Sequence, residues 1–557
     1  MLNNGYKKIL KKINNKYFLS PSGSNLEHFS KLVIFALKKV VDSQGDGPVY
    51  KAKNKSSIFN VIKKARIPQK AITDPFRILG KLPLYMSGCV KPSNPYMVKN
   101  ILPLPSFLYL SVYNAISLYM PNAVTGEDAA AVLDAEIACV AALSKLACIS
   151  PDRSAGLFTF GGTGTNFYAI KIGLSKALPA HRNDGVKDDA VIMDSRAAHY
   201  SHLTSLNWLG MGEKNQVIVK SNIDQTMNVV DFEMKVKAVL EEGKKIACIV
   251  CSGGTTSNMA IDDIYKIYKI RNKLVKKYNL DYVPHIHCDS VVGWVYLNFV
   301  KYDFNKNKLK FSSSVLQKLE GIVEKISKIK YADSFGVDFH KTGYVPYISS
   351  LVIFKNRNNL NYIQHDKKNT TPLFHNSEVY NPGKFTLETS RSGSNILATW
   401  LSVQSIGVEG FQSIIGHALE MSKLIRDEII KNEQYGLYIA NQKSFGNDVL
   451  VRCYKSGLNS EEMFMSEISD DKILKNNNEY FSKFAKWLLE NDAEKEDGIA
   501  LSRSSAAFYS HTGAPVPALR IYSLNPYFNG DDAKILVKRL VGFKKQFDKI
   551  NRHRQER

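Results

Sequence analysis

A single lysine follows a half-apolar stretch in the second half of the chain. Residues 332–339 lead into His340 and Lys341, and a turn containing Gly343 and Pro346 comes next. A lysine at the end of a buried strand is costly as an ammonium ion, because burial lowers its pKa. A neutral amine attacks a carbonyl carbon and forms a Schiff base. Because a solvated lysine after a strand gives the same local pattern, other residues must decide between the two interpretations.

Three upstream segments favour chemistry at Lys341. Gly161-Gly162-Thr163 forms a glycine-rich turn that opens a helix, and helix N-termini bind phosphate through backbone N–H groups. His199 follows the predicted strand 190–193, and Asp289 ends the apolar strand 282–288. The order along the chain is therefore glycine loop, histidine, aspartate and lysine.

This order and the local residues resemble the pyridoxal-phosphate (PLP) amino-acid decarboxylases of the glutamate, aromatic and tyrosine decarboxylase group (group II). The run from His340 to Tyr347 is most similar to bacterial tyrosine decarboxylases. The resemblance extends from about Val124 to Val408. It implies an α/β protein of PLP fold type I, with a mostly parallel, seven-stranded-type sheet in a large domain and a smaller α+β C-terminal domain.

The resemblance also implies roles for individual residues. Lys341 is expected to hold PLP as a Schiff base, and Gly161, Gly162 and Thr163 to bind its phosphate. Asp289 matches the family aspartate beside the pyridine nitrogen, which it keeps protonated so that the ring withdraws electrons. His199 matches the histidine that stacks on the ring.

Further residues match the family pattern, but the sequence allows more than one role for them. His202 competes with His199 for the stacking role. Ser252 and His340 are expected near the cofactor, with His340 at its phosphate. Tyr347 is a candidate proton donor to the substrate carbon, or a packed loop tyrosine. Arg391 is a candidate to bind a carboxylate or phosphate bidentately, or a structural residue.

The sequence departs from the family pattern at a few positions. Gly164 lies inside the glycine loop, and Val291 replaces a smaller residue close to Asp289. Val291 would be bulkier against the ring face, which affects the expected tilt of the ring. We expect Asp262 to be structural, as a helix cap.

We therefore expect a PLP-dependent carboxy-lyase that converts an L-amino acid to its amine and CO₂, through a Schiff base on Lys341 and a quinonoid intermediate. One alternative is a carbon–carbon lyase on the same fold, since fold does not settle chemistry. A second alternative is a non-catalytic paralogue that binds through its basic N-terminal segment.

Composition supports a folded protein in a reducing compartment. The chain has 557 residues, of which 44% are hydrophobic and 11% aromatic. Cys248 and Cys251 form one CxxC pair among seven cysteines, and with no second pair we expect no metal site. The first residues are rich in Lys and Asn rather than apolar, so we expect a cytoplasmic protein.

Positive charge is concentrated at the N-terminus. The net charge is +23, and residues 1–75 carry 15 Lys and Arg against four Asp and Glu. Such a concentration of positive charge is one way to bind nucleic acid or an anionic membrane. Most of the excess is Lys rather than Arg, and Asn and Ile are abundant as well, so a lysine-rich coding bias is the preferred explanation and nucleic acid is not an expected partner.

One apolar segment needs its own explanation. The best apolar part of the uncharged stretch 100–126 is 107–120, which is shorter than the roughly 20 residues of a spanning helix. No membrane span is expected. The segment is predicted to be a buried helix or part of a dimer interface, in keeping with a homodimer that shares its active sites.

Alternating strand and helix patterns define the expected organisation. We expect a basic helical arm at 1–75, an interface segment at 76–125, a large PLP-binding domain at 126–405 and a small α+β domain at 406–557. A polar loop is predicted at 457–478. The remaining predicted elements are helices at 26–41, 129–146, 165–176, 315–329 and 531–549, and strands at 190–193, 217–219, 246–251, 282–288, 334–337, 350–354 and 518–524.

Overall fold

The computed structural model describes residues 5–43, 45–51, 57–72, 74–186, 190–366, 380–491 and 495–555. It divides into two compact units. The first comprises Met1–Met97 with Lys486–Ala500, and the second comprises Val98–Ala485 with Leu501–Arg557. The finer four-part division expected from the sequence stays a prediction.

The first unit is helical. Phe35 of α2 packs edge-to-face on Phe76 of α4, with ring centroids 5.1 Å apart. Short bridges pair Val49 with Val90 and Met97 with Ala500. The helices are α1 (Gly5–Tyr17), α2 (Leu26–Asp42), α3 (Ile58–Lys64), α4 (Pro75–Leu79) and α5 (Leu82–Met86).

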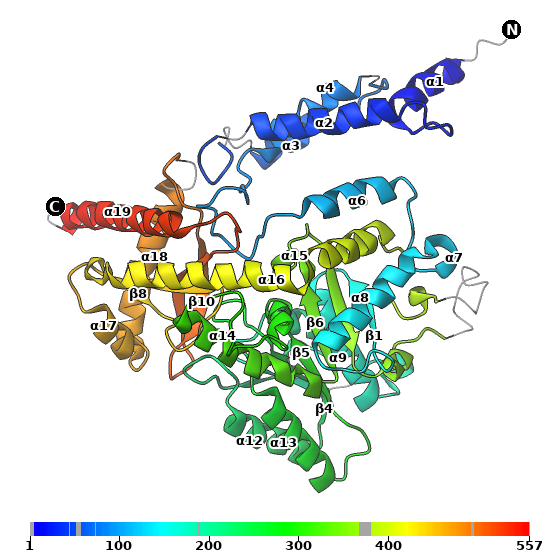
Figure 1. Cartoon of the computed structure of the whole chain (residues 1–557). Helices are drawn as coiled ribbons and strands as arrows, with labels where there is room; N and C mark the ends of the chain where they lie inside the picture. Colours follow the sequence, from blue (N-terminus) through cyan, green and yellow to red (C-terminus); the bar gives the residue numbers. More distant parts are fainter. Residues whose placement is uncertain are drawn as a thin grey trace. The chain divides into compact units, whose positions relative to one another are not determined.

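The second unit is built on a seven-stranded sheet with the order β1-β7-β6-β5-β4-β2-β3. Figure 1 labels its strands β1, β4, β5 and β6. Strand β7 is antiparallel to both its neighbours, and the other neighbouring pairs are parallel. Except for the edge strand β3, the strands are almost wholly buried, as expected for a sheet covered on both faces. They are β1 (Ala155–Thr159), β2 (Ala190–Ser195), β3 (Gln216–Val219), β4 (Lys245–Ser252), β5 (His285–Asp289), β6 (Ser334–Asp338) and β7 (Ser350–Phe354).

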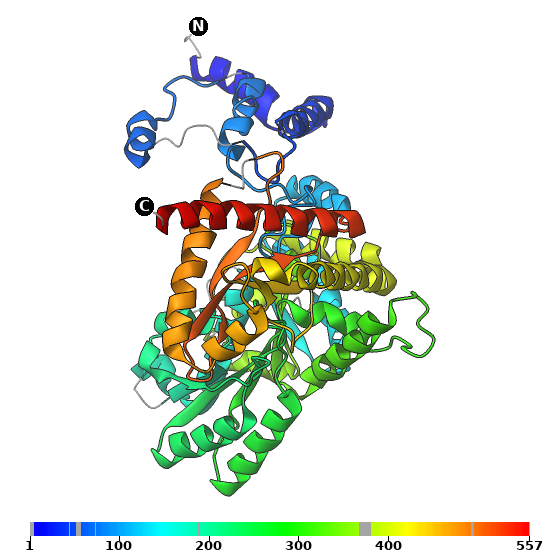
Figure 2. The same cartoon turned by 90° about the vertical axis from the view of Figure 1, so that its left-hand side faces the viewer.

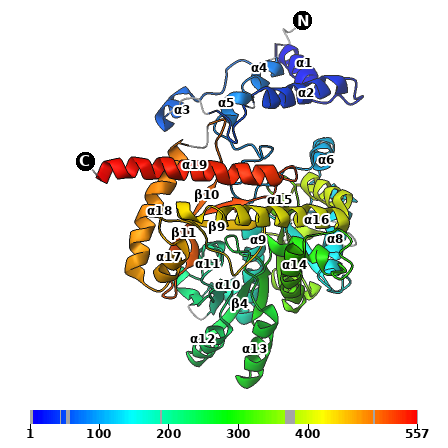
Figure 3. The same ribbon diagram turned by 60° about the vertical axis from the view of Figure 1, so that its left-hand side comes forward.

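Helices cover the sheet on both faces. Leu157 of β1 packs in the cluster that contains Ile172 of α9, whereas the next residue, Phe158, packs with residues of α8. Helices α12 and α13 pack against each other (Figure 3). The helices of this part are α6 (Phe107–Ser117), α7 (Gly126–Ala129), α8 (Val132–Leu146), α9 (Gly162–Ala177), α10 (His181–Asp184), α11 (Ser201–Trp208), α12 (Val229–Glu241), α13 (Ile264–Lys277), α14 (Ser313–Ile326) and α15 (Phe339–Thr342).

A smaller antiparallel sheet with the order β10-β11-β9-β8 completes the second unit. Helix α16 (Gly393–Ile430) leads to it and is interrupted at Gly407, whose φ is 63°. Figure 2 shows the orange and red elements of this part of the chain. They are β8 (Leu437–Ile439), β9 (Asp448–Cys453), α17 (Ser460–Glu467), α18 (Asp471–Asn491), β10 (Ser502–Tyr509), β11 (Pro515–Tyr522) and α19 (Gly530–Gln555).

The predicted fold class is confirmed, and one predicted loop is wrong. Residues 457–478 contain α17 and the start of α18 instead of a loop. The side chain of Asn459 caps α17 by accepting hydrogen bonds from the N–H groups of Glu461 and Glu462. A polar residue such as Asn459 is common both in loops and at helix N-termini, so the polar pattern of this segment does not distinguish the two. None of the described helices has the length and apolar composition that a membrane crossing requires.

Candidate active site

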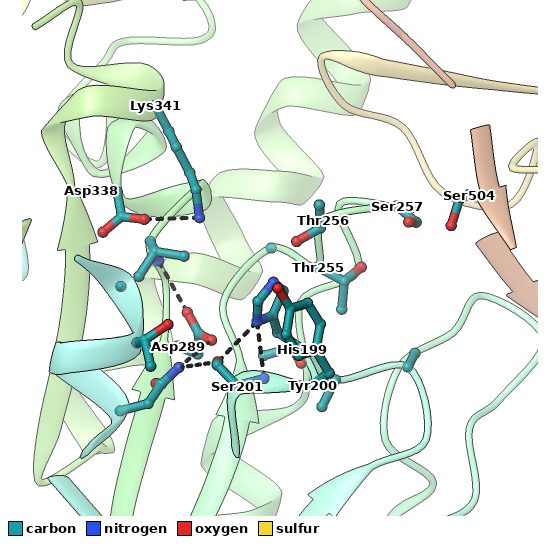
Figure 4. Close-up of a pocket in the computed structure, with 18 of the residues that line it drawn as sticks. His199, Tyr200, Ser201, Thr255, Thr256, Ser257, Asp289, Asp338, Lys341 and Ser504 are labelled. Atoms are coloured by element: carbon teal, nitrogen blue, oxygen red, sulfur yellow. Dashed lines mark hydrogen bonds and ion pairs between the residues drawn. The ribbon is translucent and has the colours of Figure 1, made fainter. Parts of the chain in front are cut away.

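A cavity of about 640 Å³ opens in the second unit at the carboxyl ends of β4, β5 and β6. Ligands of parallel α/β sheets bind at this edge. Figure 4 shows Lys341, Asp289 and His199 around the same open space. All the predicted site residues except Arg391 line the cavity: Gly161, Gly162, Thr163, His199, Ser252, Asp289, His340, Lys341 and Tyr347.

The glycine turn has the geometry of an anion site. Gly161 precedes α9 with a φ of 109°, a conformation that favours glycine. A Cβ on Gly162 would lie 2.8 Å from Asp338 Oδ2, so a larger residue does not fit there. The first hydrogen bond of the helix runs from Gly164 N–H to the carbonyl of Gly161. The N–H groups of Gly162 and Thr163 precede it and are available to an anion.

The departures from the family pattern have local packing reasons. A Cβ on Gly164 would lie 2.9 Å from Cβ of Thr159, so α9 approaches β1 too closely for a larger residue. Val291 is 7% exposed and lines the cavity. Its Cγ1 would be 3.2 Å from a Cβ on Gly162, so it contributes to the wall beside the glycine turn.

Lys341 is held by a carboxylate that the sequence analysis did not single out. Its Nζ lies 2.8 Å from Asp338 Oδ2, and Ser350 Oγ donates to Asp338 Oδ1 at 2.6 Å. Burial alone would lower the pKa of Lys341, but the charge of Asp338 outweighs burial and raises it. The expectation of a lowered pKa is therefore wrong for the chain without a bound carbonyl compound. Asp338 keeps Lys341 an ammonium ion until that ion pair is broken.

Asp289 is oriented through one of its two carboxylate oxygens. Oδ2 accepts a hydrogen bond from Asn166 Nδ2 at 3.0 Å and lies 3.3 Å from His202 Nε2. Oδ1 has one long contact, from Val291 N–H at 3.5 Å. Burial would raise the pKa of Asp289, but the hydrogen bond and charge of His202 hold it well below its usual range. The carboxylate is ionised and keeps acceptor capacity on Oδ1.

Asn166 connects Asp289 to the predicted stacking histidine. Its Oδ1 accepts from His287 Nε2 at 3.0 Å, which leaves Nδ2 to donate to Asp289 and to Ser201 Oγ at 3.1 Å. Ser201 Oγ in turn lies 2.8 Å from His199 Nδ1. Burial lowers the pKa of His199 to about 4, in spite of the nearby carboxylate of Asp289. The ring of His199 is therefore neutral near pH 7.

The structure separates the two candidate histidines. His199 lines the cavity, whereas His202 is 1% exposed and lies between Asp194 and Asp289. This placement favours His199 as the ring-facing histidine. Tyr200 lies beside His199, with ring centroids 4.5 Å apart, and is 76% exposed.

His340, just before Lys341, and Tyr347, six residues after it, lie together in space. Their ring centroids are 4.4 Å apart. His340 Nδ1–H donates to the carbonyl of Ser349 at 2.9 Å, and its Nε2 is 3.5 Å from Asp338 Oδ2. Tyr347 is 58% exposed, and the burial of the rest of its side chain raises its pKa. Its hydroxyl therefore keeps its proton near pH 7.

Arg391 lies away from the cavity. Its guanidinium is buried and forms an ion pair with Glu136. It also donates to the carbonyls of Ala123 and Phe158, at 2.8 and 3.1 Å. The carboxylate that Arg391 binds belongs to the chain itself, which favours the structural alternative.

Asp262 is structural but does not cap a helix. Its two oxygens accept hydrogen bonds from the N–H groups of Met227 and Ser252 at 2.6 and 2.7 Å. The residue that caps α13 is the next one, Asp263, which accepts from Lys266 N–H at 3.0 Å. Asp262 instead ties the end of β4, where Ser252 lines the cavity, to the segment before α12.

Sequence reasoning missed Arg520, a cationic residue of the cavity wall. Arg520 lies on β11, and its Nη1 donates to Thr256 O at 3.4 Å and Ser257 Oγ at 3.2 Å. Within the described residues, Nε is buried without a hydrogen-bond partner, and Nη2 makes no hydrogen bond. A guanidinium with an unpaired Nη2 in a cavity wall suits a carboxylate. No motif pointed to it, because β11 reaches the cavity by long-range packing.

The residues present fit PLP. The N-terminus of α9 suits its phosphate, Lys341 its aldehyde carbon and the ionised Asp289 its protonated ring nitrogen. In the described part of the chain, no three His, Cys, Asp or Glu residues are arranged to hold a metal ion.

Comparisons with known sequences point to one family. Residues 317–449, which include Lys341, match the family model described as the pyridoxal-dependent decarboxylase conserved domain. The chain is 25% identical to the L-2,4-diaminobutyrate decarboxylase of Acinetobacter baumannii, over 54% of this chain and 56% of the relative. It is 27% identical to the L-tyrosine decarboxylase of Enterococcus faecium, over 44% of this chain and 43% of the relative. The chain thus spans about half the length of these curated relatives.

Solved structures show the same fold. The model superposes on Oryza sativa TDC with PLP and tryptamine with a TM-score of 0.75 at 12% identity, covering 95% of this chain and 99% of that chain. For mouse CSAD the TM-score is 0.73 at 17% identity, with 93% and 99% covered. By sequence this chain is similar to pyridoxal-dependent amino-acid decarboxylases, and its fold is PLP fold type I.

Proposed function

We propose that this chain is a PLP-dependent decarboxylase of an L-amino acid. The observation that carries the proposal is the meeting of four separate elements in one cavity. The N-terminus of α9, His199 after β2, Asp289 at the end of β5 and Lys341 after β6 all line it. Each supplies one requirement of a phosphorylated aldehyde cofactor, and the curated relatives are named decarboxylases.

When bound, PLP supplies an electron sink for the pair that remains on the substrate carbon after CO₂ leaves. The chain's own residues bind and orient. Gly162 and Thr163 would donate N–H groups to the phosphate, and Asp289 Oδ1 would accept from the ring nitrogen. Lys341 provides the amine for covalent attachment, which requires that its ion pair with Asp338 be given up and its proton be lost.

Arg520 is the proposed carboxylate-binding residue for the substrate. Among the described residues that line the cavity, the cationic side chains are Lys341 and Arg520, and Lys341 is taken by Asp338 and the cofactor. A carboxylate held by the guanidinium of Arg520 has a fixed direction. Such orientation supports cleavage of the bond to that carboxylate.

Tyr347 is the proposed proton donor to the substrate carbon. It lines the cavity close to Lys341 and His340, and its raised pKa keeps the hydroxyl protonated near pH 7. A protonated phenol at this place can act as a general acid. His199 is neutral near pH 7, so it offers an uncharged ring face to the cofactor.

The proposal includes a homodimer with shared active sites. Helix α6 packs on α16 but leaves an apolar face open: Phe107 is 86% exposed, and Tyr119 and Met120 just after the helix are 82% and 84% exposed. A second copy is the proposed cover for this face, in place of the buried-helix alternative. The exposed rings of Tyr200 and Tyr347 at the cavity support a site that a partner completes.

A cytoplasmic location is part of the proposal and is supported by seven free cysteines.

The test is a substrate screen with the purified chain. Each of the twenty L-amino acids and L-2,4-diaminobutyrate is incubated with the PLP-loaded chain, and CO₂ and amine are measured. The expected result is equal amounts of CO₂ and amine from at least one substrate, lost in Lys341→Ala. An aldehyde without CO₂ would indicate a carbon–carbon lyase. PLP binding without any product would indicate a non-catalytic paralogue.

A further inference from the structure

His202 is a buried histidine that the mechanism above does not use. It lies on α11 and is 1% exposed. Its Nδ1 is 2.8 Å from Asp194 Oδ2, and its Nε2 is 3.3 Å from Asp289 Oδ2. The two carboxylates come from different strands, β2 and β5, and both are almost fully buried. The result is an Asp–His–Asp triad directly behind the proposed cofactor site.

The contacts of His202 fix its protonation state. An ionised carboxylate only accepts hydrogen bonds, so each of the two contacts needs an N–H group on the ring. A neutral imidazole carries one N–H group and would leave the other ring nitrogen facing a carboxylate oxygen. The geometry therefore requires an imidazolium ion between two carboxylates, with a net charge of one negative unit for the triad.

The neighbours of His202 agree with that state. Asp194 and Asp289 contact the ring, and Gln216 Nε2 donates to the same Asp194 oxygen at 2.8 Å. His287 and His199 are near enough for the charge of His202 to lower their pKa values. Burial alone would lower the pKa of His202, but the two hydrogen-bonded carboxylates raise it to about 9. Burial lowers the pKa of His287 to about 3, so that ring is neutral and adds no competing charge.

The triad determines which oxygen of Asp289 is free. His202 and Asn166 together take Oδ2, and Oδ1 keeps one long contact to Val291 N–H. Rotation of the carboxylate would break two hydrogen bonds. Burial without a cation would also favour protonation of Asp289, which would remove its charge.

We propose that His202, as an imidazolium ion between Asp194 and Asp289, is a positioning residue that fixes the orientation and the charge of Asp289 toward the ring nitrogen of PLP. This inference rests on the proposed function. The role belongs to His202 and Asp194 acting through Asp289, because His202 does not line the cavity.

The first test uses the full chain without PLP. Histidine labelled with ¹⁵N is introduced, and the signals of His202 among the 12 histidines are assigned by their loss in His202→Gln. Both ring nitrogens of His202 should be protonated at pH 7.5, and the ring should titrate near pH 9. Since the pKa is raised, the pairing is complete at neutral pH and is lost as pH rises through about 9. A neutral ring at pH 7.5 would overturn the proposal.

The second test measures the affinity for PLP. His202→Gln should weaken it at least about tenfold at pH 7.5, because two buried carboxylates lose their common cation. The double variant His202→Gln with Asp194→Asn should stay weakened, because Asp289 still lacks its cation. The wild-type affinity should fall as pH passes about 9, and this fall should be absent in His202→Gln.

A matched control separates charge from packing. His181 is also a buried histidine, but it contacts Lys171 and the carbonyl of Leu178 and does not line the cavity. His181→Gln should keep the PLP affinity and its pH profile. If His202→Gln behaves like His181→Gln, His202 is a packing residue. If the wild-type chain binds no PLP, the proposed function fails, while the ring protonation still tests the triad.

Discussion

Arg520→Met is expected to remove the binding site for the substrate carboxylate. Arg520 donates to Thr256 and Ser257 through Nη1 alone, and Nε is buried, so Nη2 is the group left for a ligand in the described part of the chain. A hydrogen bond to a charged group contributes about 1.5–3 kcal/mol. The loss of one such bond lowers kcat/KM by roughly 10- to 150-fold. PLP binding should be retained, because the glycine turn and Asp289, and not Arg520, are the proposed contacts of the cofactor.

The assay is steady-state decarboxylation with the substrate found in the screen, beside the absorbance of bound PLP. Arg520→Lys is a second variant that keeps the positive charge. This charge matters to the buried Asp448, whose pKa is raised by burial to about 7 and lowered by the charge of Arg520. A loss in both variants therefore assigns the effect to the fork of the guanidinium.

Arg503→Met is the matched control. Arg503 lies on the adjacent strand β10, where its guanidinium donates to Ser482 Oγ at 2.9 Å and lies over Phe481. It does not line the cavity, so kcat/KM should stay near that of the wild type. Equal kcat/KM in Arg520→Met and Arg503→Met would refute the role of Arg520.

Three further predictions concern the other site residues. Tyr347→Phe should slow product formation by about 10²–10⁴-fold, the usual contribution of a general acid, while the absorbance of bound PLP stays unchanged; an unchanged rate would make Tyr347 a packing residue. Asp289→Asn should keep the fold but lower turnover by roughly 10- to 150-fold, since one charge-assisted hydrogen bond to the ring nitrogen is lost; near-wild-type turnover would contradict its role. Arg391→Met should lower the free energy of unfolding in urea by about 3–5 kcal/mol, because Glu136 is left buried without its partner; full stability with a raised KM would instead indicate substrate binding.

The positions with a local signature were predictable from the sequence. Lys341, Asp289 and the glycine turn each combine one chemical group with a strand end or a helix start, and the structure brings them into one cavity. The alternating pattern also predicted β2 to β7 with shifts of a few residues at their ends. Strand and helix periodicity is a local property and needs no knowledge of distant contacts.

Elements with weak local signals were missed. Strand β1 is short, contains Gly156 and runs into the glycine turn, so its pattern is hidden, although it pairs with β7 along its whole length. In the smaller sheet β11 alone was anticipated, and Arg520 gained no role because its contacts to Thr256 and Ser257 span more than 260 residues. The partners of a buried charge are likewise set by tertiary packing.

Asp338 and His202 illustrate that limit. Asp338 stands three residues before Lys341, and the turn of α15 brings its Oδ2 to 2.8 Å from Nζ. This contact reverses the sign of the pKa shift expected from burial alone. His202 and Asp194 are eight residues apart and meet Asp289 from another strand, a relation that periodicity does not encode.

The most direct test of the central claim is the site of cofactor attachment. The chain is loaded with PLP and reduced with borohydride, which fixes the cofactor to the amine that holds it. The protein is then digested, and its peptides are mapped by mass. We predict the pyridoxyl group on Lys341 and its absence from the same peptide in Lys341→Ala. A pyridoxyl group on another lysine, or none on a correctly folded chain, would contradict the account.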